Sequence, residues 1–306
     1  MVLPDGYEAR APRPDDVAAV AGVLLAGGGQ TVLDEDFVRH EWGHEGFDLT
    51  TDAWVVTDRS GTVVAYAQVK RGEPGVIESW GAVGPEHRGR GIGSWLLDRI
   101  EERAAVMATA PGRFRHAIDR GDDAAAALLS ARGLRPLRHF WHMEIDLGAH
   151  GSPGPSPEGI EIRTVATDED IVSVHRVLDV AFAGDWDYHP EPFDRWLADA
   201  AASPDHDPSL WLLATDGRAA VGALTASAWR ERGWVSELGV LPEHRGRGIG
   251  GALLRRSFAD LGRRGLPTAV LNVDAENPTG ATAVYEAVGM RVVNGWDLWE
   301  REPGGR

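Results

Sequence analysis

The chain has no cysteine among its 306 residues. Without thiols it cannot form disulfides, zinc–thiolate sites or a cysteine acyl-enzyme. No apolar run approaches the roughly 20 residues that a helix needs to span a bilayer, and residues 1–16 lack the apolar core of a signal peptide. We therefore expect a cytoplasmic protein with no membrane partner.

Basic residues are also scarce. The 31 Lys and Arg residues against 47 Asp and Glu residues give a formal net charge of −16. Such a charge argues against a nucleic-acid partner and would attract a cationic substrate over long range. Acidity also serves solubility alone, so the charge by itself selects no substrate.

A repeat is the most informative feature that is present. The nine residues Pro-Glu-His-Arg-Gly-Arg-Gly-Ile-Gly occur at positions 85–93 and again at 242–250, about half a chain length apart. Each copy follows a strand-like run, at 76–83 and 234–241, and precedes a helical pattern. Glycine-rich turns of this kind hold phosphate, because backbone N–H groups and a helix N-terminus converge on the anion. The repeat predicts two phosphate-binding half-molecules.

The repeat also predicts the domain organisation. A chain of this length can bury two cores, and one copy of the motif falls in each half. Gly, Pro, Ser and His crowd residues 148–159 without an apolar period, which is typical of a linker. We expect an N-terminal domain at 1–148, a linker at 149–158 and a C-terminal domain at 159–306.

Each half has the pattern of a mixed α/β domain with a mixed sheet, with meandering strands first and strand–helix units later. In the second half, Asp216-Gly217 is a hairpin signal, and Leu253, Leu254, Phe258 and Leu261 share one helix face. The pattern predicts strands at 160–164, 210–215, 218–227, 234–241 and 268–273, helices at 168–183, 191–201 and 278–288, and a strand at 290–299 that closes the sheet. The first half repeats this order at 7–10, 15–25, 54–57, 62–70, 76–83, 96–108, 115–118, 124–131 and 138–147.

Three interpretations compete for the nonapeptide. A Walker A loop is excluded, because no lysine followed by Ser or Thr closes the turn. A dinucleotide fingerprint fits only the second copy, and neither half begins with the strand and glycine-rich turn that it requires. The third is an Arg-x-x-Gly-x-Gly turn, which resembles the motif by which the GNAT superfamily of N-acetyltransferases binds the pyrophosphate of acetyl-CoA. A glycine-rich connection without a ligand is the remaining alternative.

The order of elements in both halves is similar to that of GNAT enzymes, so the resemblance covers nearly the whole chain. It implies two tandem GNAT domains, acetyl-CoA as co-substrate and no metal. In the second half it assigns cofactor contacts to Leu238, Val240, Arg245, Gly246, Arg247, Gly248, Ile249, Gly250 and Asn277. In the first half it assigns them to Val83, Arg88, Gly89, Arg90, Gly91, Ile92 and Gly93.

The resemblance makes the halves unequal. In such enzymes a tyrosine in the last helix often protonates the departing thiolate, and the second half supplies Tyr285 there, with Asn277 at the start of that helix. The first half has Leu129 and Gly121 at the corresponding positions, so we expect it to be non-catalytic or weakly active. Asn277 would also serve as a helix N-cap before Pro278.

The second half must also deprotonate its acceptor. An alkylammonium has a pKa of about 10.4 and cannot attack at neutral pH until a base accepts its proton. Glu237, on the strand that leads into the motif, is our first candidate for that base. Asp185, Asp187 and His189 are alternatives and would otherwise bind the cationic substrate. With no cysteine available, we expect direct transfer in a ternary complex.

The expected function is acetylation of a primary amine on a small molecule, by a monomer or a homodimer. The tandem arrangement resembles that of the mycothiol synthases, and protein amines also remain open as acceptors. A second class of protein stays possible, namely an acetyl-CoA-binding regulatory or structural protein without turnover.

Overall fold

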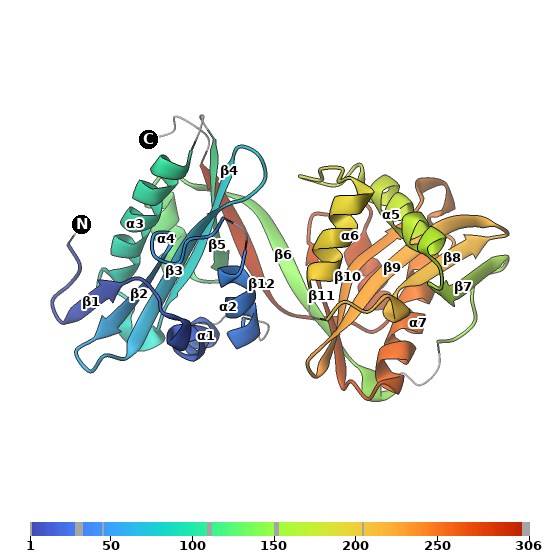
Figure 1. The fold of residues 1–306 in the computed structure, drawn as a ribbon, viewed down its shortest axis with the longest axis horizontal. Helices are drawn as coiled ribbons and strands as arrows, with labels where there is room; N and C mark the ends of the chain where they lie inside the picture. The colour runs from blue at the N-terminus through green and yellow to red at the C-terminus, as the bar shows by residue number, and fades with distance from the viewer. Residues whose placement is uncertain are drawn as a thin grey trace. The chain divides into compact units, whose positions relative to one another are not determined.

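The computed structural model describes residues 2–27, 33–44, 46–108, 112–149, 153–203 and 205–301. The chain forms two compact units (Figure 1). The N-terminal unit consists of Met1–Phe140 together with Asn294–Arg306, and the C-terminal unit consists of Trp141–Val293. No helix in the described part of the chain has both the length and the apolar character needed to cross a membrane.

The N-terminal unit is a sheet covered by helices on both faces. Its strand order is β1-β2-β3-β4-β5-β12, and every neighbouring pair with a determined register is antiparallel except β4 and β5. Side chains alternate between the faces, so Ala65 and Ala67 pack under α3 and α4, whereas Tyr66 packs under α1 and α2. Its elements are β1 (Tyr7–Arg10), α1 (Val17–Ala26), α2 (Glu35–Trp42), β2 (Ala53–Asp58), β3 (Val63–Arg71), β4 (Val76–Val83), α3 (Ile92–Met107), β5 (Arg113–Asp119), α4 (Asp123–Ala131) and the end of β12 (Arg291–Arg301).

The C-terminal unit repeats this plan with the strand order β6-β11-β10-β9-β8-β7. Helices α7 and α8 pack on one face, and α5 and α6 on the other. The predicted apolar face of α7 is confirmed, since Leu253, Leu254, Phe258 and Leu261 are each 0% exposed. Its elements are the end of β6 (Arg135–Asp146), β7 (Ile160–Thr164), α5 (Asp168–Phe182), α6 (Phe193–Ala202), β8 (Leu212–Asp216), β9 (Ala219–Trp229), β10 (Arg232–Val240), α7 (Ile249–Arg263), β11 (Thr268–Asp274) and α8 (Ala281–Ala287).

The two halves of the sequence exchange their last strands. The end of β12 pairs antiparallel with β5, from Trp296 opposite Asp119 to Arg301 opposite Phe114, and Trp299 is buried in the core of the N-terminal unit. In return β6 lies beside β11 and brings Met143 and Ile145 into the core of the C-terminal unit.

The prediction that residues 290–299 close the sheet of their own half is therefore wrong. The compact units also differ from the continuous halves 1–148 and 159–306, and residues 150–152 of the expected linker lie outside the described residues. The physical reason is that both sheets offer an open edge, at β5 and at β11. A strand with alternating apolar and polar side chains can pair with either edge equally well. The local sequence pattern therefore does not determine which sheet it joins.

Candidate active site

The first arginine of each nonapeptide stabilises its loop through hydrogen bonds to backbone carbonyls. Arg245 donates from Nε to the carbonyl of Val240 at 3.1 Å, and from Nη2 to the carbonyl of Ala181 at the end of α5 at 2.8 Å. Arg88 repeats this arrangement with Val83 at 3.1 Å and with Gly27 at 2.7 Å. Each guanidinium thus ties the end of a strand to the end of a helix. Contact of either arginine with a cofactor stays a prediction.

The second arginine of each copy is also engaged. Arg247 donates from Nη1 to Asp216 at 2.8 Å and lies 2.9 Å from a ring nitrogen of His244. Arg90 donates to the hydroxyl of Tyr7 at 3.2 Å and to the carbonyl of Glu86. Both side chains thus have partners within the protein, and their contact with a cofactor stays a prediction.

The glycines of the loop have left-handed backbones. Gly246 and Gly248 have φ values of +76° and +78°, and a Cβ atom at either position would meet open space. The loop therefore needs glycine for its conformation, and it leaves room for a ligand to approach the main chain. Helices α7 and α3 begin directly after these turns, at Ile249 and Ile92. Their N-termini add partial positive charge at both loops.

Strand β10 separates from its parallel neighbour before it reaches the motif. Its ladder with β9 continues to Val240, but its ladder with β11 ends at Trp234. The register with β9 shifts between Val235 and Glu237, which marks a bulge at this point. The main chain beyond Trp234 is consequently available on one side for an extended ligand. In the N-terminal unit the corresponding ladder of β4 with β5 continues to Trp80.

Glu237 lies on this separated part of β10. The hydroxyl of Thr225 donates to its carboxylate at 3.1 Å. Burial raises the pKa of Glu237 above its ordinary value, and hydrogen bonds from Thr225 and Trp196 oppose that rise. Nearby, the Tyr188 hydroxyl donates to Asp179 at 2.6 Å. A carboxylate with a raised pKa, among aromatic and acidic side chains, suits a base for a cationic amine.

The turn after β11 joins two of the predicted residues, Asn277 and Asp185. The side-chain amide of Asn277 donates to Asp185 at 3.1 Å, while its carbonyl oxygen accepts the N–H of Thr279 at 2.8 Å. Helix α8 begins only at Ala281, with Gly280 as its N-cap, so the expected capping role of Asn277 is wrong. The side-chain oxygen of Asn277 instead accepts the N–H and the hydroxyl of Thr279, which forms a local turn before the helix starts.

Tyr285 lies on α8 and is 8% exposed. Burial, and to a lesser extent the negative charge of Asp185, raises the pKa of its hydroxyl to about 12. The hydroxyl is therefore protonated throughout the physiological range. Burial also raises the pKa of Asp185 itself, against the effects of Asn277 and Arg245.

The other predicted substrate residues lie together in the connection between α5 and α6. Asp187 has a φ of +57°, which is unusual for a residue other than glycine. Its carboxylate lies 3.9 Å from Nε2 of His189, and His189 is exposed. Asp185 is not grouped with them, since it turns to Asn277. Sequence reasoning missed Thr225, although the β9–β10 hairpin places it directly opposite Glu237.

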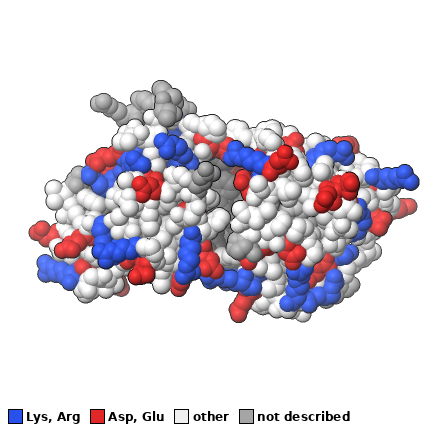
Figure 2. All heavy atoms as spheres, in the orientation of Figure 1, with Lys and Arg blue, Asp and Glu red and all other residues white. Residues whose placement is uncertain are grey.

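Charges of both signs are spread over the molecular surface. Figure 2 shows acidic and basic side chains interspersed over the visible face, so the net charge of −16 is not gathered there into one acidic patch. Among the described residues, no cluster of three His, Asp or Glu side chains could hold a metal ion.

These features define a class of protein. Two family models match the chain, "Acetyltransferase (GNAT) family" over residues 172–290 and "Acetyltransferase (GNAT) domain" over residues 50–129. A GCN5-related N-acetyltransferase from Sphaerobacter thermophilus superposes on the whole chain with a TM-score of 0.87 at 33% identity, covering 98% of that protein. The chain belongs to the GNAT acetyltransferase family and contains two GNAT domains, as the resemblance implied.

Proteins similar in sequence over most of the chain include enzymes of one particular kind. A mycothiol acetyltransferase of Beutenbergia cavernae is 33% identical over 297 residues, which cover 91% of this chain and 92% of that enzyme. A mycothiol acetyltransferase of Cellulomonas flavigena is 34% identical over 259 residues, covering 78% of this chain and 71% of that enzyme. The predicted N-acetyltransferase activity is confirmed at the level of the family, and acetyl-CoA, the acetyl donor of GNAT enzymes, agrees with it.

Proposed function

We propose that the C-terminal unit catalyses the acetyl transfer, with Glu237 as the general base and Tyr285 as the proton donor to the leaving sulfur. The observation that carries this proposal is that the C-terminal unit has both a half-buried carboxylate of raised pKa on the separated part of β10 and a buried, protonated tyrosine on α8. The N-terminal unit has Trp80 and Leu129 at the equivalent positions.

The residues fit acetyl-CoA as co-substrate. The open space at Gly246 and Gly248 leaves the N–H groups of the loop accessible to a pyrophosphate. The separated main chain up to Val240 can bond the amides of a pantetheine arm, and its N–H groups can polarise a thioester carbonyl. When bound, acetyl-CoA supplies the acetyl thioester.

The proton balance can be followed through the residues. Glu237 accepts one proton from the acceptor ammonium and later releases it to solvent. The freed amine nitrogen then bonds to the thioester carbonyl carbon, and the carbon–sulfur bond breaks. Tyr285 donates to the departing sulfur and recovers its proton from the nitrogen as the amide forms. Acid–base groups of this kind contribute about 10²–10⁴-fold each, and positioning of the two reactants contributes roughly 7–11 kcal/mol.

For the acceptor, we propose the substrate of the mycothiol acetyltransferases, with another small amine as the second candidate. Support comes from the relatives, which match along nearly the whole chain. It comes also from the surroundings of Glu237, where Tyr188, Trp196 and the carboxylate of Asp179 lie close by. Aromatic faces and carboxylates together attract a cationic amine. Protein amines are the alternative that the assay must exclude.

The test is an acetyl-transfer assay with the full chain that follows the loss of thioester absorbance as acetyl-CoA is consumed. The chain has no cysteine that could react with the thioester, and this readout stays valid for an acceptor that carries a thiol of its own. We expect turnover with the mycothiol acetyltransferase acceptor to exceed that with simple aminosugars and lysine peptides, and mass spectrometry to show one added acetyl group. Binding of acetyl-CoA without turnover on any amine would instead support a binding protein. Preference for the lysine peptides would overturn the small-molecule assignment.

A further inference from the structure

Two hydrogen bonds from different elements converge on the carboxylate of Glu237. The hydroxyl of Thr225, directly opposite on β9, donates to it at 3.1 Å, and the indole N–H of Trp196 on α6 donates to it as well. Thr225 is 2% exposed, so its hydroxyl has little access to water as another partner. An ionised carboxylate has about four acceptor sites. The two donors therefore fix its direction and leave sites for the ammonium of an acceptor.

The indole of Trp196 is itself held by aromatic rings. Its ring centroid lies 5.2 Å from that of His175 on α5 and 5.4 Å from that of Trp211, which precedes β8. The ring of His175 is fixed in turn by its Nε2 atom, which lies 2.9 Å from the backbone carbonyl of Glu191. Because a carbonyl only accepts, Nε2 is the donor of this bond. Contacts outside α6 thus determine the direction of the Trp196 N–H.

Helix α6 depends on such contacts for its position. None of its ten residues, all within the described ranges, is buried, and its N-cap Pro192 makes no side-chain cap hydrogen bond. Its partly buried side chains Trp196, Leu197 and Ala200 pack on the core formed by α5, β8 and β9. The hydrogen bond from Trp196 therefore links the position of α6 to the carboxylate on β10.

The N-terminal unit lacks both this carboxylate and its donors. Trp80 stands in its place, five residues before the proline of the first nonapeptide, and Gln68 lies opposite Trp80 on β3. The side-chain amide of Gln68 donates to the buried Glu41 on α2 at 2.6 Å. The indole of Trp42, on the same helix, donates to the hydroxyl of Tyr66 at 2.8 Å. The corresponding donors thus serve contacts within the N-terminal core.

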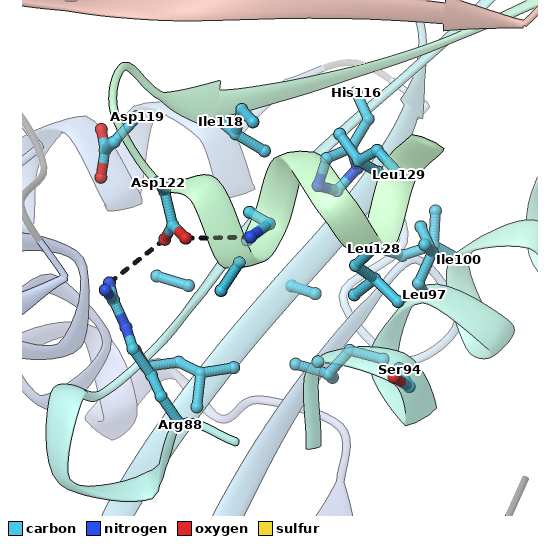
Figure 3. Close-up of a pocket in the computed structure, with 18 of the residues that line it drawn as sticks. Arg88, Ser94, Leu97, Ile100, His116, Ile118, Asp119, Asp122, Leu128 and Leu129 are labelled. Atoms are coloured by element: carbon cyan, nitrogen blue, oxygen red, sulfur yellow. Dashed lines mark hydrogen bonds and ion pairs between the residues drawn. The ribbon is translucent and has the colours of Figure 1, made fainter. Parts of the chain in front are cut away.

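The carboxylates beside the first nonapeptide also have a different setting. Figure 3 shows Asp119 and Asp122 on the side of the pocket where Arg88 lies, away from Leu129. Asp122 lies 3.4 Å from the guanidinium of Arg88 and caps α4 by accepting the N–H of Ala125. Its partners are a cation and the backbone, not a buried hydroxyl and an indole. The arrangement at β10 is thus not a general consequence of the shared fold.

We propose that Thr225 and Trp196 are positioning residues for the base, which direct the Glu237 carboxylate toward the acceptor ammonium and make this direction depend on the position of α6. The inference rests on the proposed function, because it takes Glu237 to be the base. Neither positioning residue takes up or gives a proton in the reaction. Their effect is on the direction of the carboxylate and on the pH at which it ionises.

The groups that face Glu237 determine how its pKa responds to a lost donor. Burial raises this pKa, the two donors lower it, His175 lowers it by its charge, and Glu191 raises it. Tyr188 adds no charge, because burial raises the pKa of its hydroxyl well above the ordinary value. Removal of either donor should therefore raise the pKa of Glu237 further and leave the surrounding charges as they are.

The pH profile of kcat/KM tests the proposal, with acetyl-CoA consumption by the full chain as the readout. Thr225→Val and Trp196→Phe each remove one donor, and each should raise the midpoint of the rise in kcat/KM by about one pH unit. Thr225→Ser keeps a hydroxyl and should keep the wild-type midpoint. Thr215→Val is the matched control, because it removes a buried hydroxyl from the neighbouring strand β8, and it should also leave the midpoint unchanged.

The kinetic constants above the midpoint separate direction from ionisation. There Glu237 is ionised in every variant that retains it, so a change of pKa alone would restore the wild-type kcat. We expect kcat of Thr225→Val and Trp196→Phe to stay about tenfold below wild type, because the carboxylate is no longer directed. KM for the acceptor should change less than kcat.

The outcomes for the base and for its positioning residues can be told apart. Wild-type midpoints in both Thr225→Val and Trp196→Phe, or an equal shift in Thr215→Val, would overturn the inference and leave Glu237 as the base. If Glu237→Gln instead retains the rise of kcat/KM with pH, the base itself is assigned wrongly, and the inference fails together with that part of the proposed function.

A spectroscopic measurement covers the case in which a positioning variant does not fold. In wild-type chain labelled with ¹⁵N-tryptophan, the indole N–H signal of Trp196 should shift with pH at the midpoint of the rise in kcat/KM. Glu237→Gln identifies that signal, because it should abolish the shift. If all twelve tryptophan signals stay constant across the midpoint, Trp196 does not contact the base and the inference is refuted for α6.

Discussion

Replacing Tyr285 with Phe removes one oxygen atom and keeps the ring that packs in the core of the C-terminal unit. The side chain is 8% exposed, so the phenyl ring fills the same space. We expect the variant to fold normally, with a change in the free energy of unfolding within about 1 kcal/mol. A loss of activity would then report the hydroxyl and not the fold.

The pKa of the Tyr285 hydroxyl determines how large a fall in kcat we expect. The pKa of the Tyr285 hydroxyl is raised to about 12, whereas an alkyl thiol has a pKa of about 8.5. Proton transfer from the hydroxyl to the thiolate is therefore unfavourable by itself, and it proceeds only together with the return of a proton from the nitrogen. Before that transfer the hydroxyl stabilises the developing charge as a hydrogen-bond donor. This places the expected fall in kcat near the lower end of the 10²–10⁴ range, about 10²-fold or roughly 3 kcal/mol.

The assay is steady-state consumption of the acetyl-CoA thioester at saturating acceptor, with thermal unfolding measured on the same samples. Tyr7→Phe, which removes a hydroxyl from the N-terminal unit, is the control. KM for acetyl-CoA should change little, because the interaction forms only as charge develops on sulfur. A Tyr285→Phe enzyme with kcat within twofold of wild type would refute the assignment of chemistry to this residue.

Four further measurements test the roles of Asp185, Glu237 and Trp299. Asp185→Asn replaces a charged acceptor of the Asn277 amide by a neutral one, and should raise KM for acetyl-CoA about fivefold in steady-state kinetics, with kcat changed less. Glu237 must be ionised to act as a base, so kcat/KM should rise as the pH passes through its raised pKa. The Glu237→Gln variant should not show this rise of kcat/KM with pH. The raised pKa also means that the native state loses stability as pH rises above about 4.5 through that pKa, and the glutamine variant should lack this loss in unfolding measurements. Trp299→Ala should cost the N-terminal unit about 3–5 kcal/mol by hydrogen exchange in β5, whereas Val292→Ala, at an exposed position, should cost little.

Much of the fold could be predicted because its signals are local. The bounds of β1, β4 and β7 agree with the predicted ranges, and the Asp216-Gly217 hairpin joins β8 to β9. The helix α2 was not predicted. Its boundaries depend on the capping carboxylate of Asp34, and its inward face carries the buried Glu41, which an apolar pattern does not reveal.

The candidate site was predictable in its residues but not in their connections. The motif locates the loop, but the bonds of Arg245 to two backbone carbonyls require the end of α5 to lie nearby. The hydrogen bond between Asp185 and Asn277 joins residues 92 positions apart. The same holds for Trp80, whose packing against Phe37 closes one side of β4. Such contacts depend on tertiary arrangement, on which a single sequence carries no direct signal.

The exchange of strands has a consequence for how the protein is made on the ribosome. Arg120, just after β5, bonds to Asp297, which follows it by 177 residues. At about 5–20 residues per second, the edge of β5 waits roughly 9–35 s for its partner strand. The unit whose synthesis begins first is thus completed last. During that interval an unpaired edge is exposed, and we expect nascent chains stalled before residue 294 to bind chaperones more strongly than chains extended past residue 301.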